Sequence, residues 1–306
     1  MNDKALVSVI IPTYKRPEFL SNAIDSVLNQ TYKNIEIIVV DDNNPDSLER
    51  VETEKIMNKY NKNPCIKYIR HEKNKNGSAA RNTGIKNSSG RYIAFLDDDD
   101  EFLPNKIQLQ VERLESLDDS WGMCYTKFVR KKHNKIIDKG IENTEGDISI
   151  ELLKGSLYIS AGSNLMIRRD IVEKINGFNE LFLRRQDLEF LIRASQIAKV
   201  AHVPEICLII NKDDRSNILT ETQLIKNTEE FLSVFDKYIS KLQEHEREQV
   251  MIGQYLLLAR FYLIRMKIRS MLKVCKKHNI SIFILIRYIF YLIKRRIFKQ
   301  CYGFKL

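Results

Sequence analysis

The chain has 306 residues, of which 43% are hydrophobic and 29% charged, and its formal net charge at pH 7 is +10. This composition supplies enough apolar residues for a core, which excludes a wholly disordered chain and allows one medium domain with an appendage or two domains. The five cysteines are scattered without a CxxC pair, which argues against a disulfide framework or a zinc site and favours reduced thiols in the cytosol.

The first hundred residues alternate short apolar runs with helical patterns. We expect strands at residues 6–11, 35–40, 66–70 and 92–96, and helices at residues 17–30, 47–60 and 79–86. This alternation predicts an α/β fold with a mainly parallel, Rossmann-like sheet. Further on, we expect helices at 106–117, 170–175 and 188–197, strands at 122–131, 162–167 and 200–210, and helices only from residue 217.

Four consecutive aspartates, Asp97 to Asp100, follow the apolar run 92–96. Neighbouring carboxylates repel one another unless a cation lies among them, and hard divalent cations prefer oxygen ligands. Strand alternation would point Asp97 and Asp99 to the same side, and ligands of open α/β sheets gather beyond the carboxyl ends of strands. The run therefore has two interpretations: a metal site, or a solvated acidic turn before the helix that starts near Pro104.

The usual phosphate-binding loops are missing from the sequence. The turn after the first strand reads PTYKRP over residues 12–17, and no GxGxxG or GxxxxGK[ST] motif occurs. This disfavours a dinucleotide dehydrogenase and a P-loop enzyme. A metal ion held by Asp97 and Asp99 would instead neutralise a bound diphosphate.

Six segments in order resemble the family 2 glycosyltransferases of the GT-A fold, over about residues 6–210. They are residues 7–14 (VSVIIPTY), 39–42 (VVDD), 77–84 (GSAARNTG), 95–100 (FLDDDD), 176–180 (NGFNE) and 186–193 (QDLEFLIR). The resemblance, to the bacterial surface-polysaccharide type, implies a GT-A catalytic domain over residues 1–215. A basic, helical C-terminal region would follow over residues 216–306.

The resemblance also implies roles for individual residues. Pro12, Thr13 and Tyr14 would line the nucleobase pocket, Asp42 would accept hydrogen bonds from the base, and Arg81, Asp97 and Asp98 would contact the nucleotide. Asp99 would bind Mn²⁺ or Mg²⁺ directly, with Asp97 at the metal or the ribose. Asp187 would be the catalytic base, with Glu189 as the alternative. Three of these residues keep a structural alternative. Tyr14 could be a turn residue, Arg81 could form a helix-face salt bridge, and Glu189 could be a carboxylate at a helix N-terminus.

The activity that the resemblance implies is that of an inverting, metal-dependent glycosyltransferase of the hexosyltransferase type. It would move a sugar from a nucleoside diphosphate, with UDP the expected nucleotide, to a hydroxyl of a saccharide acceptor in cell-surface polysaccharide synthesis. A lipid-linked saccharide is one form of acceptor that the resemblance allows. Two positions depart from the family pattern. Gln186 replaces the usual glutamate, and residues 212–216 lack a histidine, leaving Lys212 or Arg215 as the local cation.

The positive charge is concentrated at the C-terminus. No Asp or Glu follows Glu248, whereas thirteen Lys and Arg lie between Arg260 and Lys305, so the rest of the chain is slightly acidic. Apolar segments at 255–271 and 281–298 fit either a helical hairpin packed on the catalytic domain or an interfacial helix on an anionic membrane. Arg287 interrupts the second segment, which argues against a membrane span.

The expected location is cytoplasmic, peripheral at the inner face of the plasma membrane. The apolar run at residues 6–11 is too short for a signal peptide, and no run reaches transmembrane length. The alternative functions are a nucleic-acid-binding protein that uses the basic tail and an inactive, sugar-binding GT-A fold. The apolar character of the tail and the acidic body argue against nucleic acid as a partner.

Overall fold

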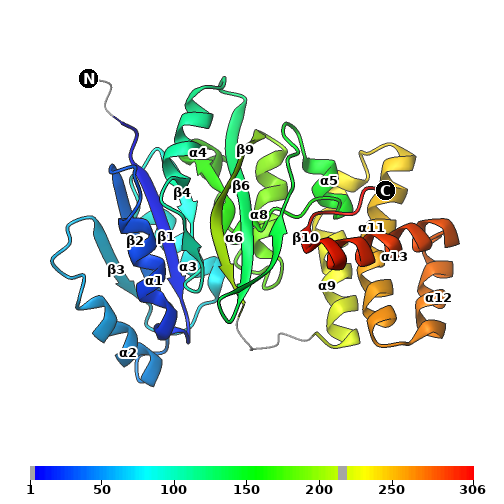
Figure 1. Cartoon of the computed structure of the whole chain (residues 1–306), viewed down its shortest axis with the longest axis horizontal. Coiled ribbons are helices and arrows are strands. Elements are labelled where there is room, and N and C mark those ends of the chain that lie inside the picture. The colour runs from blue at the N-terminus through cyan, green and yellow to red at the C-terminus, as the bar shows by residue number, and fades with distance from the viewer. Residues whose placement is uncertain (1–3, 213–218) are drawn as a thin grey trace. The chain divides into compact units, whose positions relative to one another are not determined.

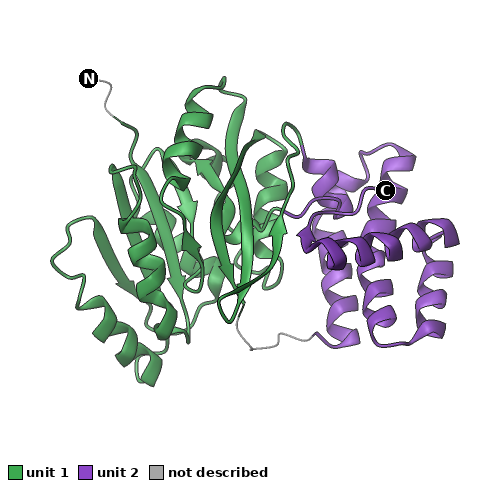
Figure 2. Cartoon of the chain, in the orientation of Figure 1, with its two compact units in different colours: residues 1–147, 159–212 green, residues 148–158, 213–306 purple. Residues whose placement is uncertain are grey.

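The computed structural model describes residues 4–212 and 219–306. The chain forms two compact units, one of residues 1–147 and 159–212 and the other of residues 148–158 and 213–306 (Figure 2). The segment 148–158 thus belongs with the C-terminal helices, although it lies within the sequence of the first unit. The boundary expected at residues 215 and 216 falls outside the described residues.

A parallel sheet forms the N-terminal half of the first unit. Its strands are β1 (Val7–Thr13), β2 (Ile35–Asp41), β3 (Ile66–Arg70) and β4 (Tyr92–Phe95) (Figure 1). Parallel pairing joins β1 to both β2 and β4, and β2 to β3. Every residue from Ile37 to Val40 is buried, as expected when helices cover both faces of a parallel sheet.

The sheet continues in a mixed half, and its strand order through the first unit is β7-β6-β8-β4-β1-β2-β3. The added strands are β5 (Glu101–Phe102), β6 (Trp121–Lys132), β7 (Lys135–Gly140), β8 (Met166–Arg168) and β9 (Lys199–Asn211). The strand β9 runs parallel to β6, whereas β7 and β8 run antiparallel to it. The predicted α/β fold with a mostly parallel sheet is confirmed.

The helices of the first unit follow the predicted order. They are α1 (Pro17–Leu28), α2 (Leu48–Met57), α3 (Gly77–Lys86), α4 (Lys106–Glu115), α6 (Ala161–Asn164), α7 (Arg169–Lys174) and α8 (Gln186–Ser195). The helix α1 packs on α2, and α3 packs on β1 and β2. The N-terminal ends of α3 and α8 carry residues of the candidate site.

The strand predicted at residues 162–167 is wrong over its first half, because residues 161–164 form the short helix α6. The cause is the buried side chain of Asn164. Its Nδ2 donates to the carbonyl oxygens of Thr126 and Ile159, at 2.7 and 2.8 Å, and its Oδ1 accepts from the Thr126 hydroxyl at 2.9 Å. The hydrogen bonds of the Asn164 side chain thus hold residues 161–164 in place, whereas the prediction had assigned this role to backbone pairing in the sheet.

The second unit is built of helices. Its elements are α5 (Ser149–Lys154), α9 (Glu221–Val234), α10 (Asp236–Ile239), α11 (Glu244–Ile264), α12 (Ile268–Lys277), α13 (Ile282–Phe298) and the two-residue strand β10 (Gln300–Cys301). Apolar side chains of α11, α12 and α13, among them Leu256, Met271 and Leu285, form one buried cluster. None of the helices in the described part of the chain has the length and apolarity to cross a bilayer.

Candidate active site

The four aspartates form a turn beyond the end of β4. The strand ends at Phe95, and the backbone N–H of Asp100 donates to the carbonyl oxygen of Asp97 at 3.0 Å. The strand alternation invoked for Asp97 and Asp99 therefore does not apply, because β4 ends at Phe95 and a turn follows. Each of the four side chains has its own partner.

Asp98 and Asp100 face the interior of the first unit. Asp98 accepts a hydrogen bond from the Thr13 hydroxyl at 2.8 Å, and Asp100 accepts from the Ser163 hydroxyl at 2.6 Å and the Asn211 backbone N–H at 3.1 Å. Burial raises the pKa of Asp98 to about 7 and the pKa of Asp100 well above its ordinary value. These two carboxyl groups fasten the turn to β1, α6 and β9.

Asp97 and Asp99 each meet an arginine. Arg81 Nη2 lies 2.5 Å from Asp97 Oδ1, and Arg16 Nη1 contacts Asp99 Oδ2. Arg81 comes from α3 and is buried, whereas Arg16 precedes α1 and is partly exposed. The ion pair of Arg81 thus joins α3 to the aspartate turn.

Asp187 lies in the first turn of α8, where the helix dipole favours a negative charge. A Cβ atom placed on Gly162 would lie 3.1 Å from Asp97 Oδ2 and 3.9 Å from Asp187 Oδ2, so both carboxylates face the same glycine. Burial raises the pKa of Asp187, Arg81 opposes that shift, and the negative charge of Asp97 adds to it. The two predicted functional carboxylates are therefore neighbours in space although ninety residues apart in sequence.

Gln186, the departure from the family pattern, has a partner on α3. Its Oε1 accepts a hydrogen bond from the Ser78 hydroxyl at 2.6 Å. A Cβ atom on Gly77 would come within 2.9 Å of Gln186 Nε2 and 3.0 Å of Arg81 Nη1, so a larger residue there would make the ends of these two side chains shift. The amide side chain thus links the N-terminal ends of α3 and α8 at the candidate site.

Glu189, the alternative base, is buried and forms an ion pair with Arg193. Arg193 Nε and Nη2 lie 2.6 and 2.9 Å from the two carboxylate oxygens of Glu189. The same guanidinium donates to the carbonyl oxygens of Ile175 and Gly177, at 2.6 and 2.8 Å. Glu189 therefore holds an arginine that braces the 175–177 turn, which favours Asp187 as the base.

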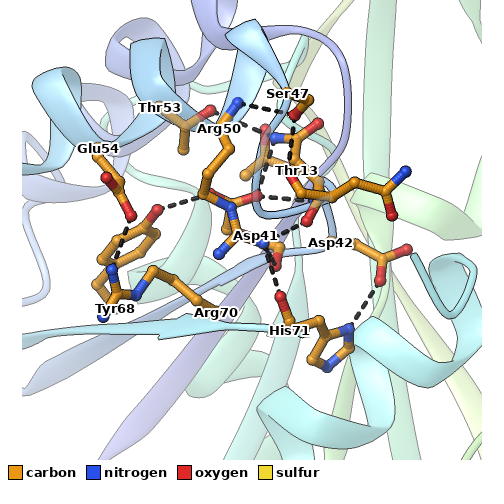
Figure 3. Close-up of polar contacts among 12 residues, drawn as sticks. Thr13, Asp41, Asp42, Ser47, Arg50, Thr53, Glu54, Tyr68, Arg70 and His71 are labelled. Carbon is orange, nitrogen blue, oxygen red and sulfur yellow. Dashed lines mark hydrogen bonds and ion pairs between the residues drawn. The ribbon is translucent and has the colours of Figure 1, made fainter. Parts of the chain in front are cut away.

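Asp42, just after β2, is only 2% exposed and accepts four hydrogen-bond contacts, of which the one with His71 can be followed in Figure 3. His71 Nδ1 lies 2.7 Å from Oδ1, Asn74 Nδ2 lies 2.8 Å from Oδ2, and the backbone N–H groups of Lys75 and Asn76 donate at 2.8 and 3.0 Å. Asp42 thus orders the segment between β3 and α3. A direct contact with a nucleobase would replace one of these donors.

The neighbouring Asp41 faces the interior. It is paired with Arg50 Nε at 3.1 Å and accepts from the Tyr68 hydroxyl at 2.6 Å (Figure 3). Burial raises the pKa of Asp41. The two adjacent aspartates therefore have separate environments, Asp41 in the core and Asp42 at the loop, as expected for consecutive residues at a strand end.

Residues 12–14 lie at the end of β1, beside the aspartate turn. Thr13 is buried through its bond to Asp98, whereas the Tyr14 side chain is 39% exposed and presents an aromatic surface. The backbone N–H of Tyr14 donates to Asp98 at 3.3 Å, which fixes the position of this surface. Pro12 is half-buried within β1.

Four residues of the site escaped the sequence analysis: Arg16, His71, Asn74 and Gly162. Arg16 and His71 follow β1 and β3, and the carboxyl ends of neighbouring parallel strands meet at one edge of a sheet. A search for polar residues just after each predicted strand would have found these two. Gly162 carries no chemical group and becomes visible only when two carboxylates approach it.

The fit of a divalent metal ion depends on its ligands. Within the described ranges, no group of three or more His, Cys, Asp or Glu side chains is placed to hold a metal ion. Mg²⁺ is commonly bound through one or two carboxylates, with phosphates and water completing the shell. Asp97 and Asp99, each already beside a cationic guanidinium, fit that kind of site. Lys212 is exposed, and Arg215 lies outside the described residues.

A Rossmann-like sheet with a carboxylate turn, a buried arginine and a facing aspartate at its carboxyl edge defines a GT-A fold. The chain belongs to glycosyltransferase family 2, because the model of that family, described as Glycosyl transferase family 2, matches residues 8–176.

Three similar proteins illustrate the relationship. An uncharacterized glycosyltransferase of Rickettsia bellii is 32% identical over 262 residues, which are 83% of this chain and 36% of that protein. The UDP-Glc:alpha-D-GlcNAc-diphosphoundecaprenol beta-1,3-glucosyltransferase of Escherichia coli is 36% identical over 137 residues, 45% of this chain and 51% of that protein. A Pyrobaculum calidifontis mannosyltransferase, solved with GDP-Man and Mn²⁺, superposes with a TM-score of 0.59 at 12% identity, covering 97% of this chain and 88% of its own. The chain thus spans about a third of the Rickettsia relative and shares the fold of the archaeal structure.

Proposed function

We propose that the chain transfers a sugar from a nucleoside diphosphate, UDP, to a hydroxyl of a saccharide acceptor, with inversion at the anomeric carbon. The observation that carries the proposal is the approach of Asp97 and Asp187 to Gly162 with Arg81 beside them. Two carboxylates thus approach one position without a side chain, and in this proposal Asp97 lies toward the nucleotide and Asp187 is the base. The E. coli relative, whose name gives UDP-Glc as its donor, supports UDP as the nucleotide.

The nucleotide would lie along the carboxyl edge of β1, β2 and β4. In this proposal the Tyr14 ring supplies a surface for the base, Pro12 and Thr13 line its pocket, and Asp98 fixes the Tyr14 backbone. Asp42 contributes by ordering the 71–76 segment and by exchanging one of its donors for a base N–H.

Asp99 would hold Mg²⁺ or Mn²⁺, with Asp97 in the metal shell or at the ribose. When bound, the cation supplies positive charge that stabilises the departing diphosphate. Arg81 and Arg16 are paired with Asp97 and Asp99, and in this proposal their guanidinium groups would also bind phosphate oxygens of the donor. The Pyrobaculum structure, which contains Mn²⁺, supports a metal of this kind.

Asp187 would take the proton of the acceptor hydroxyl as the oxygen attacks the anomeric carbon and the bond to the diphosphate breaks. The proton then lies on Asp187, and no covalent intermediate forms. Its raised pKa suits this role, because a more basic carboxylate takes up a proton more readily. Arg81 opposes the shift and so favours the ionised form that a base requires.

The acceptor and the location complete the proposal. The E. coli relative is named for a diphosphoundecaprenol-linked acceptor, which supports a lipid-linked saccharide in cell-surface polysaccharide synthesis. Residues 1–215 would act as the catalytic domain, and the basic helical region 216–306 would associate with an anionic membrane at its cytoplasmic side. Nucleic acid is not a partner in this proposal.

A thermal-shift experiment tests the nucleotide site. We expect UDP to raise the melting temperature only when Mg²⁺ or Mn²⁺ is present, because a ligand that binds the native state stabilises it by mass action. Asp99→Asn should remove the metal dependence, whereas Asp46→Asn, an exposed aspartate outside the site, should keep it. UDP stabilisation that is equal with and without metal in the unaltered chain would contradict the proposal.

A further inference from the structure

The helix α13 has an apolar face on the outside of the second unit. Its side chains Phe283, Ile286, Phe290, Ile293 and Ile297 are between 46% and 68% exposed. They are spaced alternately by three and four residues, which places them in one stripe along the helix. On the opposite side of α13, Leu285 and Tyr288 are buried in the cluster shared with α11 and α12.

Cations border this stripe on both sides. A rotation of about 100° per residue places Arg287 and Lys294 beside Phe290 on one border and Arg296 beyond Ile293 on the other. All three are exposed. No acidic residue occurs after Glu248, so the surface of α13 carries only positive charge.

The apolar stripe and the cations beside it together discriminate among the possible partners of α13. A second α13 packed on the first would bring cations of the same sign together without an acidic residue between them, which opposes self-pairing. Nucleic acid would satisfy the cations but would leave the apolar stripe against a charged backbone. An anionic bilayer satisfies both, because the stripe enters the acyl boundary while Lys and Arg meet phosphate groups.

We propose that α13 docks on an anionic lipid bilayer and lies in the plane of its surface. The cluster on the other side of the helix keeps it attached to the second unit during docking. The inference rests on the proposed function for its purpose, since docking would bring a glycosyltransferase to lipid-linked acceptors. The docking itself stands on the α13 surface alone.

Cosedimentation with phosphatidylcholine vesicles, with and without phosphatidylglycerol, tests the docking. We expect the full chain to sediment with the anionic vesicles and to be released by salt, which screens the attraction. The double variant Phe283→Asp with Phe290→Asp should lose about tenfold or more in partitioning, because two apolar side chains no longer leave water. Its control is Leu48→Asp on α2, since Leu48 is 69% exposed and Phe290 67% exposed.

A second pair of variants tests the charges. Lys294→Gln with Arg296→Gln should weaken partitioning about thirtyfold, which corresponds to about 2 kcal/mol for two cations near an anionic surface. Lys237→Gln with Lys241→Gln makes the same change in net charge at exposed positions outside α13 and should have little effect. All variants alter exposed side chains, and thermal unfolding would verify that they fold.

Two results would overturn the docking surface. One is equal sedimentation of the full chain and the α13 variants with both kinds of vesicle. The other is a chain whose oligomeric state changes with Phe283→Asp and Phe290→Asp while lipid binding does not, which would assign the stripe to a second copy. UDP binding, measured in the same variants, should be unchanged, so a failure of the glycosyltransferase proposal would be seen separately.

Discussion

The Arg16 guanidinium contacts Asp99, the carboxylate that we propose as the metal ligand. The same Nη1 lies 3.7 Å from Asp98 Oδ1, so one cation serves two adjacent aspartates at the mouth of the site. A guanidinium in this position compensates the charge that a divalent ion would otherwise compensate. Metal binding at Asp99 must therefore displace Arg16 or share the carboxylate with it.

The first prediction follows from this competition. Arg16→Gln should strengthen the binding of Mn²⁺ alone, without nucleotide, by up to about fivefold, the range set by a partly exposed ion pair. Titration calorimetry or the spectroscopic signal of free Mn²⁺ would measure the change. Arg70→Gln, which removes an exposed arginine paired with Glu54, is the control. Mn²⁺ binding that is unchanged or weaker in Arg16→Gln would show that Arg16 does not compete.

The second prediction concerns the base. Asp187→Asn should reduce transfer by about 10²-fold or more while UDP and metal still bind, because the amide cannot accept the acceptor's proton. Steady-state transfer and UDP binding would be measured on one preparation. Glu189→Gln should instead lower stability through the lost ion pair with Arg193. Transfer that survives in Asp187→Asn and disappears in Glu189→Gln would reverse the two roles.

The pH dependence of transfer supplies the third prediction. A base must be ionised to act, and burial raises the pKa of Asp187. The rate should therefore fall on the acidic side at a pH above the value typical of an exposed aspartate, and not below it. In Arg81→Gln the fall should move to still higher pH, since Arg81 lowers the pKa of Asp187. If the rate of Arg81→Gln fell at the same pH as that of the unaltered chain, a group other than Asp187 would control the acidic side of the pH profile.

These predictions use a site that the sequence foretold in part. The parallel strands could be predicted because continuous runs of Ile and Val are typical of strands that are buried on both faces. Asp97, Asp187 and Arg81 could be predicted because they stood in recognisable motifs. The meeting of Asp97 and Asp187 at Gly162 could not be predicted, because it depends on α6, which Asn164 holds by side-chain bonds to distant residues. Arg16, the partner of Asp99, was missed because a single arginine in a turn carries no periodic pattern.

The region from residue 135 to 155 resisted prediction for a different reason. It holds β7 of the first unit and then α5, which belongs with the C-terminal helices. The residues that complete its core are therefore about a hundred positions away in sequence. In α11, Gln254 Nε2 donates to the carbonyl oxygen of Leu153 at 2.5 Å. A contact over this distance in the sequence cannot be predicted from a local pattern.

The fourth prediction concerns Asp42 and its donors. Asp42→Asn should lower the free energy of unfolding by about 1–3 kcal/mol, because one carboxylate oxygen becomes an amide that faces N–H donors. Chemical denaturation would measure the loss, with the exposed Asp46→Asn as the matched control. UDP binding should weaken as well, since the 71–76 segment loses its anchor. If Asp42→Asn kept full stability but bound UDP more weakly, the role of Asp42 would be to contact the uracil base and not to order the 71–76 segment.

Glu36 gives a test of the fold that does not involve the active site. It lies on β2 and accepts hydrogen bonds from the Ser8 hydroxyl at 2.7 Å and the Ser89 hydroxyl at 2.9 Å, with Lys67 Nζ at 3.1 Å. Burial alone would raise its pKa, but the donors Ser89, Ser8 and Lys67 outweigh burial and lower the pKa to about 2.

The lowered pKa of Glu36 makes the stability of the folded chain depend on pH, which gives a fifth prediction. Because the pKa of Glu36 is lower in the folded chain than its ordinary 4.5, its stabilisation is fully present above pH 4.5 and is lost as the pH falls toward about 2. Glu36→Gln should therefore lower the free energy of unfolding at neutral pH by about 1.5–3 kcal/mol, the range for hydrogen bonds to a charged group. The variant should also lose less stability than the unaltered chain on acidification, which denaturant unfolding across the pH range would measure. Glu54→Gln, at an exposed pair with Arg70, should leave both properties nearly unchanged. Parallel pH profiles for Glu36→Gln and the unaltered chain would show that the Glu36 carboxylate gains nothing from these donors, and that Ser8 and Ser89 stabilise the junction of β1, β2 and β4 by other means.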